Sequence, residues 1–259
     1  MLFPMQLSLR MVIIVMIGVF LASFVDGVAG GGGIISVPTY LIAGLPAHLA
    51  LGTNKLSSCV GTAVSACRFM RSGYVDWRLG LPSIMLALFG AHLGTRLQLA
   101  VDERYLKWLL LIVLPAVAFV VLRQKKLPER SEDMPGTRRA AIVLSASLVV
   151  GAYDGFYGPG TGTFLLLIFC TLAKMDVRTA SGNVKLVNLA SNVGALFTSL
   201  LSGKVFIVLG LIGAAASVAG HYIGSGLAIK DGSKIVRPVV LVVLLLLAVK
   251  VIAELAGQG

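Results

Sequence analysis

Residues 26–33 read DGVAGGGG, and residues 154–162 read DGFYGPGTG. Each stretch follows an apolar run, residues 11–25 in the first case and 140–153 in the second. A glycine-rich break inside lipid leaves backbone groups unsatisfied at several kcal/mol each, so it persists only where protein or a wet cavity surrounds it. Two such breaks at matching places in two parts of a chain indicate the binding site of a transporter.

The composition is typical of a membrane protein. Of the 259 residues, 57% are hydrophobic and 13% are charged, whereas a soluble domain carries roughly 25% charged residues. The formal net charge is +11, but the basic residues stand singly or in short groups between apolar runs. This distribution follows the positive-inside rule. We therefore expect an all-α integral membrane protein with no nucleic-acid partner.

The second half of the sequence repeats the first. A shift of 130 residues carries Lys55 onto Lys185 and Gly90 onto Gly220, and the two glycine stretches align at a shift of 128 residues. Such self-similarity indicates one folding unit used twice. The sequence thus predicts two homologous transmembrane halves, residues 1–122 and 140–259, joined by a basic cytoplasmic linker at 123–139.

Each half is predicted to contain five helical pieces. Their ranges are 11–25, 34–43, 47–70, 77–99 and 104–122, then 140–153, 163–173, 177–201, 205–229 and 234–253. The first piece of each half has an uncharged core of roughly 22 Å at 1.5 Å per residue, which is short of the ~30 Å hydrocarbon layer. The second piece is shorter still. We therefore predict a broken helix with a re-entrant segment, followed by three full transmembrane helices, in each half.

The basic residues give a topology. By the positive-inside rule the linker faces the cytoplasm, and Arg68, Arg71 and Arg78 should lie on the same side. A re-entrant second piece gives four crossings per half, parallel repeats and cytoplasmic termini. A second piece that crosses fully gives five crossings and inverted repeats. We favour the first topology.

Two lysines are the leading candidates for function. Lys55 and Lys185 are each the ninth residue of their predicted helix, near the bilayer midplane. A lysine there costs ~2.5–3.5 kcal/mol, so its presence at two equivalent positions calls for a use. Either the two cations flank an anion, or each forms a buried ion pair with Asp26 or Asp154. Both arrangements could hold in different states.

The glycine stretches fit an anion site. A helix that begins after a glycine-rich turn offers free N–H groups and the positive end of its dipole, although glycine clusters also serve tight helix packing. Asn188 and Asn192, four residues apart on one helix face, line the same path or join helices by hydrogen bonds. The predicted substrate-binding residues are Lys55, Lys185, Gly31, Gly32, Gly33, Gly160, Thr161, Gly162, Thr163, Asn54 and Asn183.

Asp26 and Asp154 end the first helical piece of each half. They either couple transport to protons, through a carboxylate that desolvation favours in its neutral form, or cap helices and hold the lysines. No His, Cys or carboxylate cluster has metal-ligand spacing, and no enzyme or nucleotide-binding motif is present. The sequence thus predicts no metal, no cofactor and no enzymatic activity.

The same residues carry a family resemblance. The stretch 26–33, Pro38 and the LGTNK of 51–55 resemble the sulfite exporter TauE/SafE family, also called the toluene sulfonate uptake permeases. The second half repeats the match at 154–155, 158–160 and 182–185. This resemblance implies a multi-pass transporter of sulfite, sulfonates or related small organic anions in the bacterial inner membrane.

These observations leave three functions to compare. The leading one is a secondary transporter that binds a small anion between the halves. The alternatives are a passive anion channel and a proton-coupled cation or metal carrier that uses the two aspartates. The expected partners are the anion and the lipid bilayer, and the sequence leaves a homodimer open. In the second glycine stretch Tyr157 and Pro159 replace Ala29 and Gly31, so the two half-sites should not be equivalent.

Overall fold

The computed structural model describes residues 7–102 and 130–256, and every regular element in those ranges is an α-helix. The helices before residue 103 are α1 (Leu9–Ala29), α2 (Gly33–Ile42), α3 (Ala47–Arg71) and α4 (Trp77–Ala100). Those after residue 129 are α6 (Gly136–Phe156), α7 (Thr161–Thr171), α8 (Val177–Leu201), α9 (Ile207–Asp231) and α10 (Ser233–Ala256).

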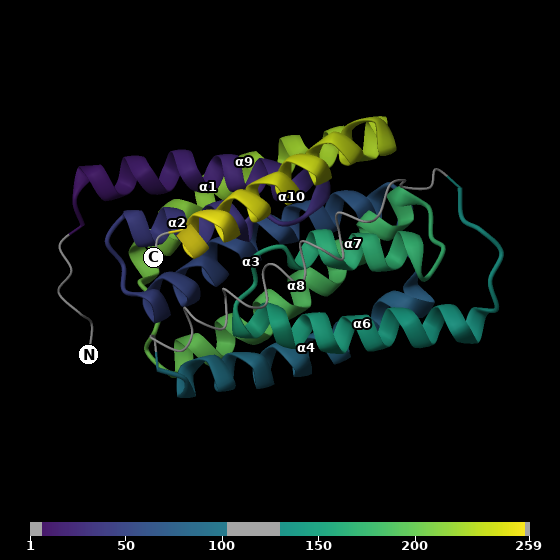
Figure 1. Ribbon diagram of the computed structural model, residues 1–259, viewed down its shortest axis with the longest axis horizontal. Helices are drawn as coiled ribbons and strands as arrows, with labels where there is room; N and C mark the ends of the chain where they lie inside the picture. Colours follow the sequence, from purple (N-terminus) through teal and green to yellow (C-terminus); the bar gives the residue numbers. More distant parts are fainter. Residues whose placement is uncertain (1–6, 103–129, 257–259) are drawn as a thin grey trace.

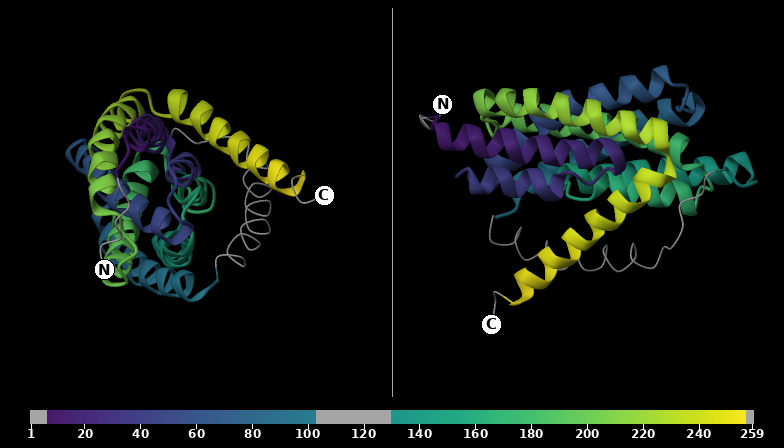
Figure 2. Two further views of the ribbon diagram at one scale, coloured as in Figure 1. Left: turned by 90° about the vertical axis from the view of Figure 1, so that its left-hand side faces the viewer. Right: turned by 90° about the horizontal axis from the view of Figure 1, so that it is seen from above.

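The long helices form one bundle, with α10 inclined across it (Figures 1 and 2). α2 folds back along α1, and Figure 1 shows α7 folding back along α6 in the same way. α4 packs along α6 and α8, while α9 packs along α1 and α3. Elements from before residue 103 and after residue 129 are thus interleaved rather than set side by side.

Glycines allow these helices to approach closely. A Cβ at Gly94 of α4 would lie 1.9 Å from the carbonyl oxygen of Ala152 in α6, and one at Gly224 of α9 would lie 2.3 Å from that of Phe24 in α1. Without a driving force from water, helices in a bilayer associate through such close packing of small residues. The glycines of α4 and α9 therefore set these two crossings.

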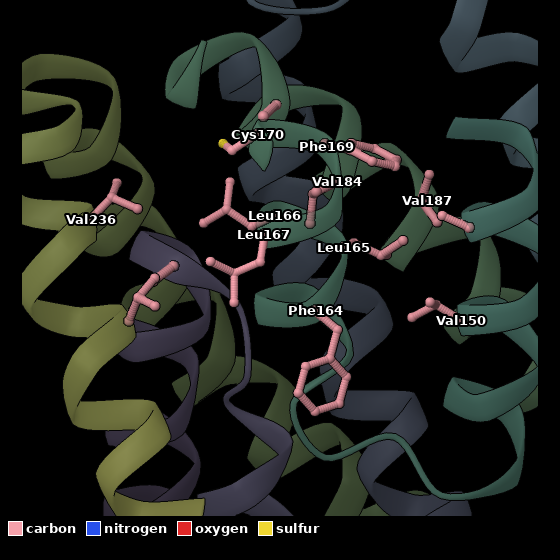
Figure 3. Close-up of a cluster of buried hydrophobic side chains, with 14 of the residues drawn as sticks. Val150, Phe164, Leu165, Leu166, Leu167, Phe169, Cys170, Val184, Val187 and Val236 are labelled. Carbon is pink, nitrogen blue, oxygen red and sulfur yellow. The ribbon is translucent and has the colours of Figure 1, made fainter. Parts of the chain in front are cut away.

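The short helix α7 is surrounded by protein. Figure 3 shows Phe164, Leu165 and Phe169 of α7 among Val150 of α6 and Val187 of α8. All of α7 from Thr161 to Leu167 is buried. A helix of 11 residues cannot cross a bilayer alone, but its N-terminal end is buried in protein, as irregular backbone at membrane depth requires.

The outer faces of the bundle are apolar. Leu81, Met85 and Phe89 follow at four-residue spacing along α4 and are 62%, 66% and 57% exposed. Four of the described helices (α1, α6, α8 and α9) are long and apolar enough to span a membrane. Exposed apolar stripes of this size belong in contact with lipid, which agrees with the predicted all-α membrane protein.

The predicted length of the first helical piece was wrong. α1 and α6 each have 21 residues, roughly 32 Å at 1.5 Å per residue, because each continues past its buried aspartate rather than ending there. The second pieces are indeed short, with 10 residues in α2 and 11 in α7. Residues 136–139, predicted as linker, form the first turn of α6. The predicted piece 104–122 lies outside the described residues.

The described ends of the chain lie away from the linker. Ser131, just before α6, bonds Asp176 at the start of α8, and Arg178 of α8 lies over Tyr74 in the turn between α3 and α4. The linker and that turn are therefore at one end of the bundle, as expected. The start of α1 and the end of α10 lie at the opposite end (Figures 1 and 2). This arrangement separates the described chain ends from the linker along the bundle.

Candidate functional site

The two glycine loops touch each other in the middle of the bundle. Gly30 and Gly31 between α1 and α2 have φ of 76° and 86°, and Gly158 and Gly160 before α7 have φ of 95° and 86°. These are conformations that glycine adopts without strain. A Cβ at Gly162 would lie 2.7 Å from the Cα of Gly30. Only glycine lets the two backbones come this close.

A polar cavity lies beside this contact. It has an empty volume of about 460 Å³, its opening included. Its wall comes from α1, α2, α3, α6, α7, α8 and α9, and so from both parts of the chain. The lining residues are Ala22, Ser23, Asp26, Gly31, Gly32, Gly33, Ser36, Asn54, Lys55, Ser58, Thr62, Asp154, Gly158, Thr161, Gly162, Asn188, Asn192 and His221.

Lys55 of α3 lies on this wall and pairs with Asp154 of α6. Its Nζ is 2.8 Å from Asp154 Oδ2, and the two side chains are 6% and 7% exposed. Lys55 also donates to Asn192 Oδ1 at 3.2 Å. The carboxylate of Asp154 accepts two hydroxyl hydrogen bonds, from Thr161 at 2.9 Å and from Ser191 at 2.7 Å. The pair is buried but extensively hydrogen-bonded, which a buried charge requires.

Lys185 of α8 pairs with Asp26 of α1 in the same manner. Its Nζ is 3.4 Å from Asp26 Oδ2 and also donates to the Asp26 backbone carbonyl. Asp26 Oδ1 accepts from the backbone N–H of Gly32 at 3.1 Å. His221 of α9 places Nε2 3.7 Å from Asp26 Oδ2. Asp26 lines the cavity, whereas Lys185 lies behind it and is not among the lining residues.

Each buried pair joins an element before the linker to one after it. The ion-pair alternative for the lysines is therefore the arrangement in this structure. The two lysines and two aspartates are opposite in sign and equal in number, so their formal charges sum to zero. An anion that enters the cavity adds a negative charge that the four groups do not already neutralise.

α3 and α8 present polar groups at the same spacing. Ser58 and Thr62 follow Lys55 by three and seven residues, and Asn188 and Asn192 follow Lys185 by the same intervals. Residues at this spacing share a helix face, and all four line the cavity. Asn192 Oδ1 accepts a hydrogen bond from Lys55. The shared helix face of Asn188 and Asn192, noted from the sequence, is the face that lines the cavity.

Two cavity amides carry oxygens without partners. The side-chain oxygens of Asn54 and Asn188 are buried and make no hydrogen bond to the described residues. Buried acceptors are nearly always satisfied in folded proteins. These two acceptors are therefore available to a hydrogen-bond donor such as ordered water.

Most of the predicted binding residues are brought together here. Gly31, Gly32, Gly33, Thr161, Gly162, Asn54 and Lys55 line the cavity, as do both aspartates. Four do not: Lys185, Gly160, Thr163 and Asn183. Gly160 caps α7, Thr163 donates to the carbonyl of Ala29 at 3.4 Å, and Asn183 donates to that of Thr179 at 2.8 Å.

The prediction missed several lining residues. Ser58 and Thr62 were detectable, because they align with Asn188 and Asn192 at the repeat shift. His221 aligns with Ala91, so the repeat gave no signal for it. No group of three or more His, Cys, Asp or Glu side chains that could hold a metal ion occurs in residues 7–102 and 130–256.

The chain is similar to known membrane proteins over nearly its whole length. The profile of a family described as sulfite exporter TauE/SafE matches residues 15–251. A probable membrane transporter protein, ORF9 of Sinorhizobium sp, is 35% identical over 96% of this chain and 95% of its own. The probable membrane transporter protein YfcA of Escherichia coli K12 is 33% identical over 97% and 95%. No solved structure is significantly similar to the chain.

Proposed function

This chain belongs to the sulfite exporter TauE/SafE family and is a multi-pass membrane transporter, and on that premise we propose that it carries small anions through the cavity beside Lys55. The anions are sulfite, organosulfonates or related organic acids. The transport is secondary, because the described chain offers no nucleotide-binding element. The chain itself is the transporter and acts without a cofactor.

The position of Lys55 carries this proposal. It places an ammonium group on the wall of a polar cavity deep in an otherwise apolar bundle. Backbone of the first turns of α2 and α7, at Gly33 and Gly162, faces the same space, and helix N-termini favour anions. Lys185 acts indirectly in this scheme, through its hold on Asp26.

We further propose that the two parts of the chain are inverted repeats. One support is that the folded-back pairs α1–α2 and α6–α7 run in opposite directions. The other is that the helix contacts correspond: α4 packs along α6 and α8, and its counterpart α9 packs along α1 and α3. The arrangement resembles transporters in which broken helices meet at a central site. It replaces the parallel arrangement favoured from the sequence, since the chain ends lie opposite the linker.

The basic residues orient this bundle in the bacterial inner membrane. Arg68, Arg71 and Arg78 lie at the linker end, together with Lys174 and Arg178. The positive-inside rule places that end in the cytoplasm. Leu9 and Ala256 then lie at the outer face. The proposal needs one copy of the chain, and a homodimer is not required to complete the cavity.

The two alternative functions make different predictions. A passive channel would show flux that does not saturate and would not accumulate the anion when a proton gradient is imposed. A cation carrier would need a free carboxylate, whereas Lys55 and Lys185 already neutralise Asp154 and Asp26. The ammonium group of Lys55 on the cavity wall and the N-terminal turns of α2 and α7 therefore favour an anion over a cation.

The test is anion flux in proteoliposomes that contain Lys55→Met with Asp154→Asn. This double variant removes the cation but leaves no unpaired buried charge, so it should fold. Loss of one charge-assisted hydrogen bond, about 1.5–3 kcal/mol, corresponds to a roughly 10–100-fold loss of anion affinity. Sulfite, taurine, sulfoacetate and simple carboxylates should be screened for binding first.

The matched control is Lys174→Met with Glu132→Gln. That pair is 2.9 Å apart with 38% and 58% exposed side chains, and it lies outside the cavity. It should leave flux unchanged. Transport by the Lys55–Asp154 double variant at the rate of the unaltered protein would refute the site.

A further inference from the structure

The two buried carboxylates of the cavity differ in the number of cations that they face. Asp154 faces one, Lys55, and its oxygens are otherwise held by the hydroxyls of Thr161 and Ser191. Asp26 faces two at the same oxygen, with Lys185 Nζ at 3.4 Å and His221 Nε2 at 3.7 Å from Oδ2. Two groups that can carry positive charge thus lie within reach of Asp26 Oδ2, whereas Asp154 has only one such neighbour.

His221 is held in position for this contact. Its side chain is 2% exposed, and Nδ1 lies 2.8 Å from the hydroxyl of Ser65 on α3. The hydroxyl can accept or donate, so it can remain bonded to either protonation state of the ring. The ring also lines the cavity. His221 therefore lies where a change in the cavity's charge reaches it directly.

The charges of the site imply a proton when an anion binds. Lys55, Lys185, Asp26 and Asp154 sum to zero, so a monoanion leaves the buried site with one uncompensated negative charge. Such a charge costs several kcal/mol in a low-dielectric interior. One proton taken from solution restores neutrality. No bond other than those to this proton forms or breaks.

We propose that His221, together with Asp26, is the site that takes up this proton and so couples anion transport to the proton gradient. An anion bound beside Lys55 adds a negative charge to the cavity that Asp26 and His221 also line, and a protonated His221, 3.7 Å from Asp26 Oδ2, offsets it. The groups that face Asp26 are Lys185 from α8, His221 from α9 and the N–H of Gly32, which precedes α2. Asp154 with Lys55 lies on the other wall and keeps its charge, because the hydroxyl donors remain.

This inference rests on the proposed anion site, and the two can fail separately. It assigns coupling to Asp26 with His221, whereas the sequence suggested Asp26 and Asp154 alike. Intramembrane ionisable groups of this kind commonly form proton relays. A single proton per monoanion makes transport electroneutral.

The experiment measures protons and anions together. Liposomes with the full chain receive radiolabelled methanesulfonate, which stays ionised at all pH values used, so any proton that accompanies it is carried by the protein. A pH-sensitive dye inside reports proton entry. The unaltered protein should carry one proton per anion, and His221→Gln should lower that ratio to near zero and abolish uphill accumulation.

The matched control is His92→Gln. His92 also bonds a hydroxyl, Thr198 Oγ1 at 2.8 Å, but does not line the cavity, so the control should keep one proton per anion. An unchanged ratio in His221→Gln, or proton-free transport by the unaltered protein, overturns the inference and leaves the anion site standing. Absence of any anion binding by the unaltered protein overturns both.

A variant that does not transport is still informative. Methanesulfonate binding can be followed by calorimetry in two buffers of different ionisation enthalpy, which counts protons taken up on binding. The unaltered protein should bind one proton with the anion, and His221→Gln none. Equal proton uptake by the two proteins contradicts the proposal.

Discussion

Removal of Lys55 alone should destabilise the protein strongly. Its Nζ lies 2.8 Å from Asp154 Oδ2 in a pair whose side chains are 6% and 7% exposed. Methionine fills similar space but leaves the carboxylate buried without its cation. Breaking a buried pair in this way costs about 3–5 kcal/mol. At roughly 2–4 °C per kcal/mol for a chain of this size, the midpoint of thermal unfolding in detergent should fall by roughly 6–20 °C.

A double-mutant cycle separates the pair from the packing of the lysine stem. Asp154→Asn should recover most of the loss in the Lys55→Met background, because the neutral amide needs no cation. The coupling free energy between the two sites should therefore be large. The exposed pair of Lys174 and Glu132 should give about 0–1 kcal/mol. Lys55→Met with the stability of the unaltered protein would refute the buried pair.

Two further predictions concern the bundle. A Cβ at Gly94 would lie 1.9 Å from a backbone oxygen of α6, so Gly94→Ala should lower the free energy of unfolding by about 1–3 kcal/mol. In the same unfolding assay Gly136→Ala should be neutral, because a Cβ at Gly136 would meet nothing within 4 Å. In a Cys67→Ala background, Ser131→Cys should react with a membrane-impermeant maleimide from the cytoplasmic side and Ser8→Cys from the outer side. Labelling of both from one side would contradict the orientation.

Much of the site was predictable because charge in an apolar chain is conspicuous. Lys55 and Lys185 stood out through the cost of a lysine at membrane depth, and the glycine loops through the cost of broken backbone. Both signals are local and physical. The short α2 and α7 followed from the same reasoning. These elements could be read without any knowledge of which helices pack together.

What failed depended on partners distant in the sequence. α1 was predicted too short because Asp26 was treated as a helix end, whereas Lys185, 159 positions away, neutralises it and lets the helix continue. His221 was passed over because only the fold brings it to Asp26. The choice between parallel and inverted repeats also depends on how the helices pack.

Under the proposed anion transport, the ion pairs would connect anion binding to movement of the bundle. Lys55–Asp154 and Lys185–Asp26 each join an element before the linker to one after it. An anion that draws Lys55 away from Asp154 weakens a contact worth about 3–5 kcal/mol when broken without replacement. Converting a two-state equilibrium from 1:99 to 99:1 takes about 5.5 kcal/mol. The free energy of breaking one or two such ion pairs is therefore large enough to change which arrangement of the bundle is favoured. Cavity charges that only held the fold together would not respond to an anion in this way.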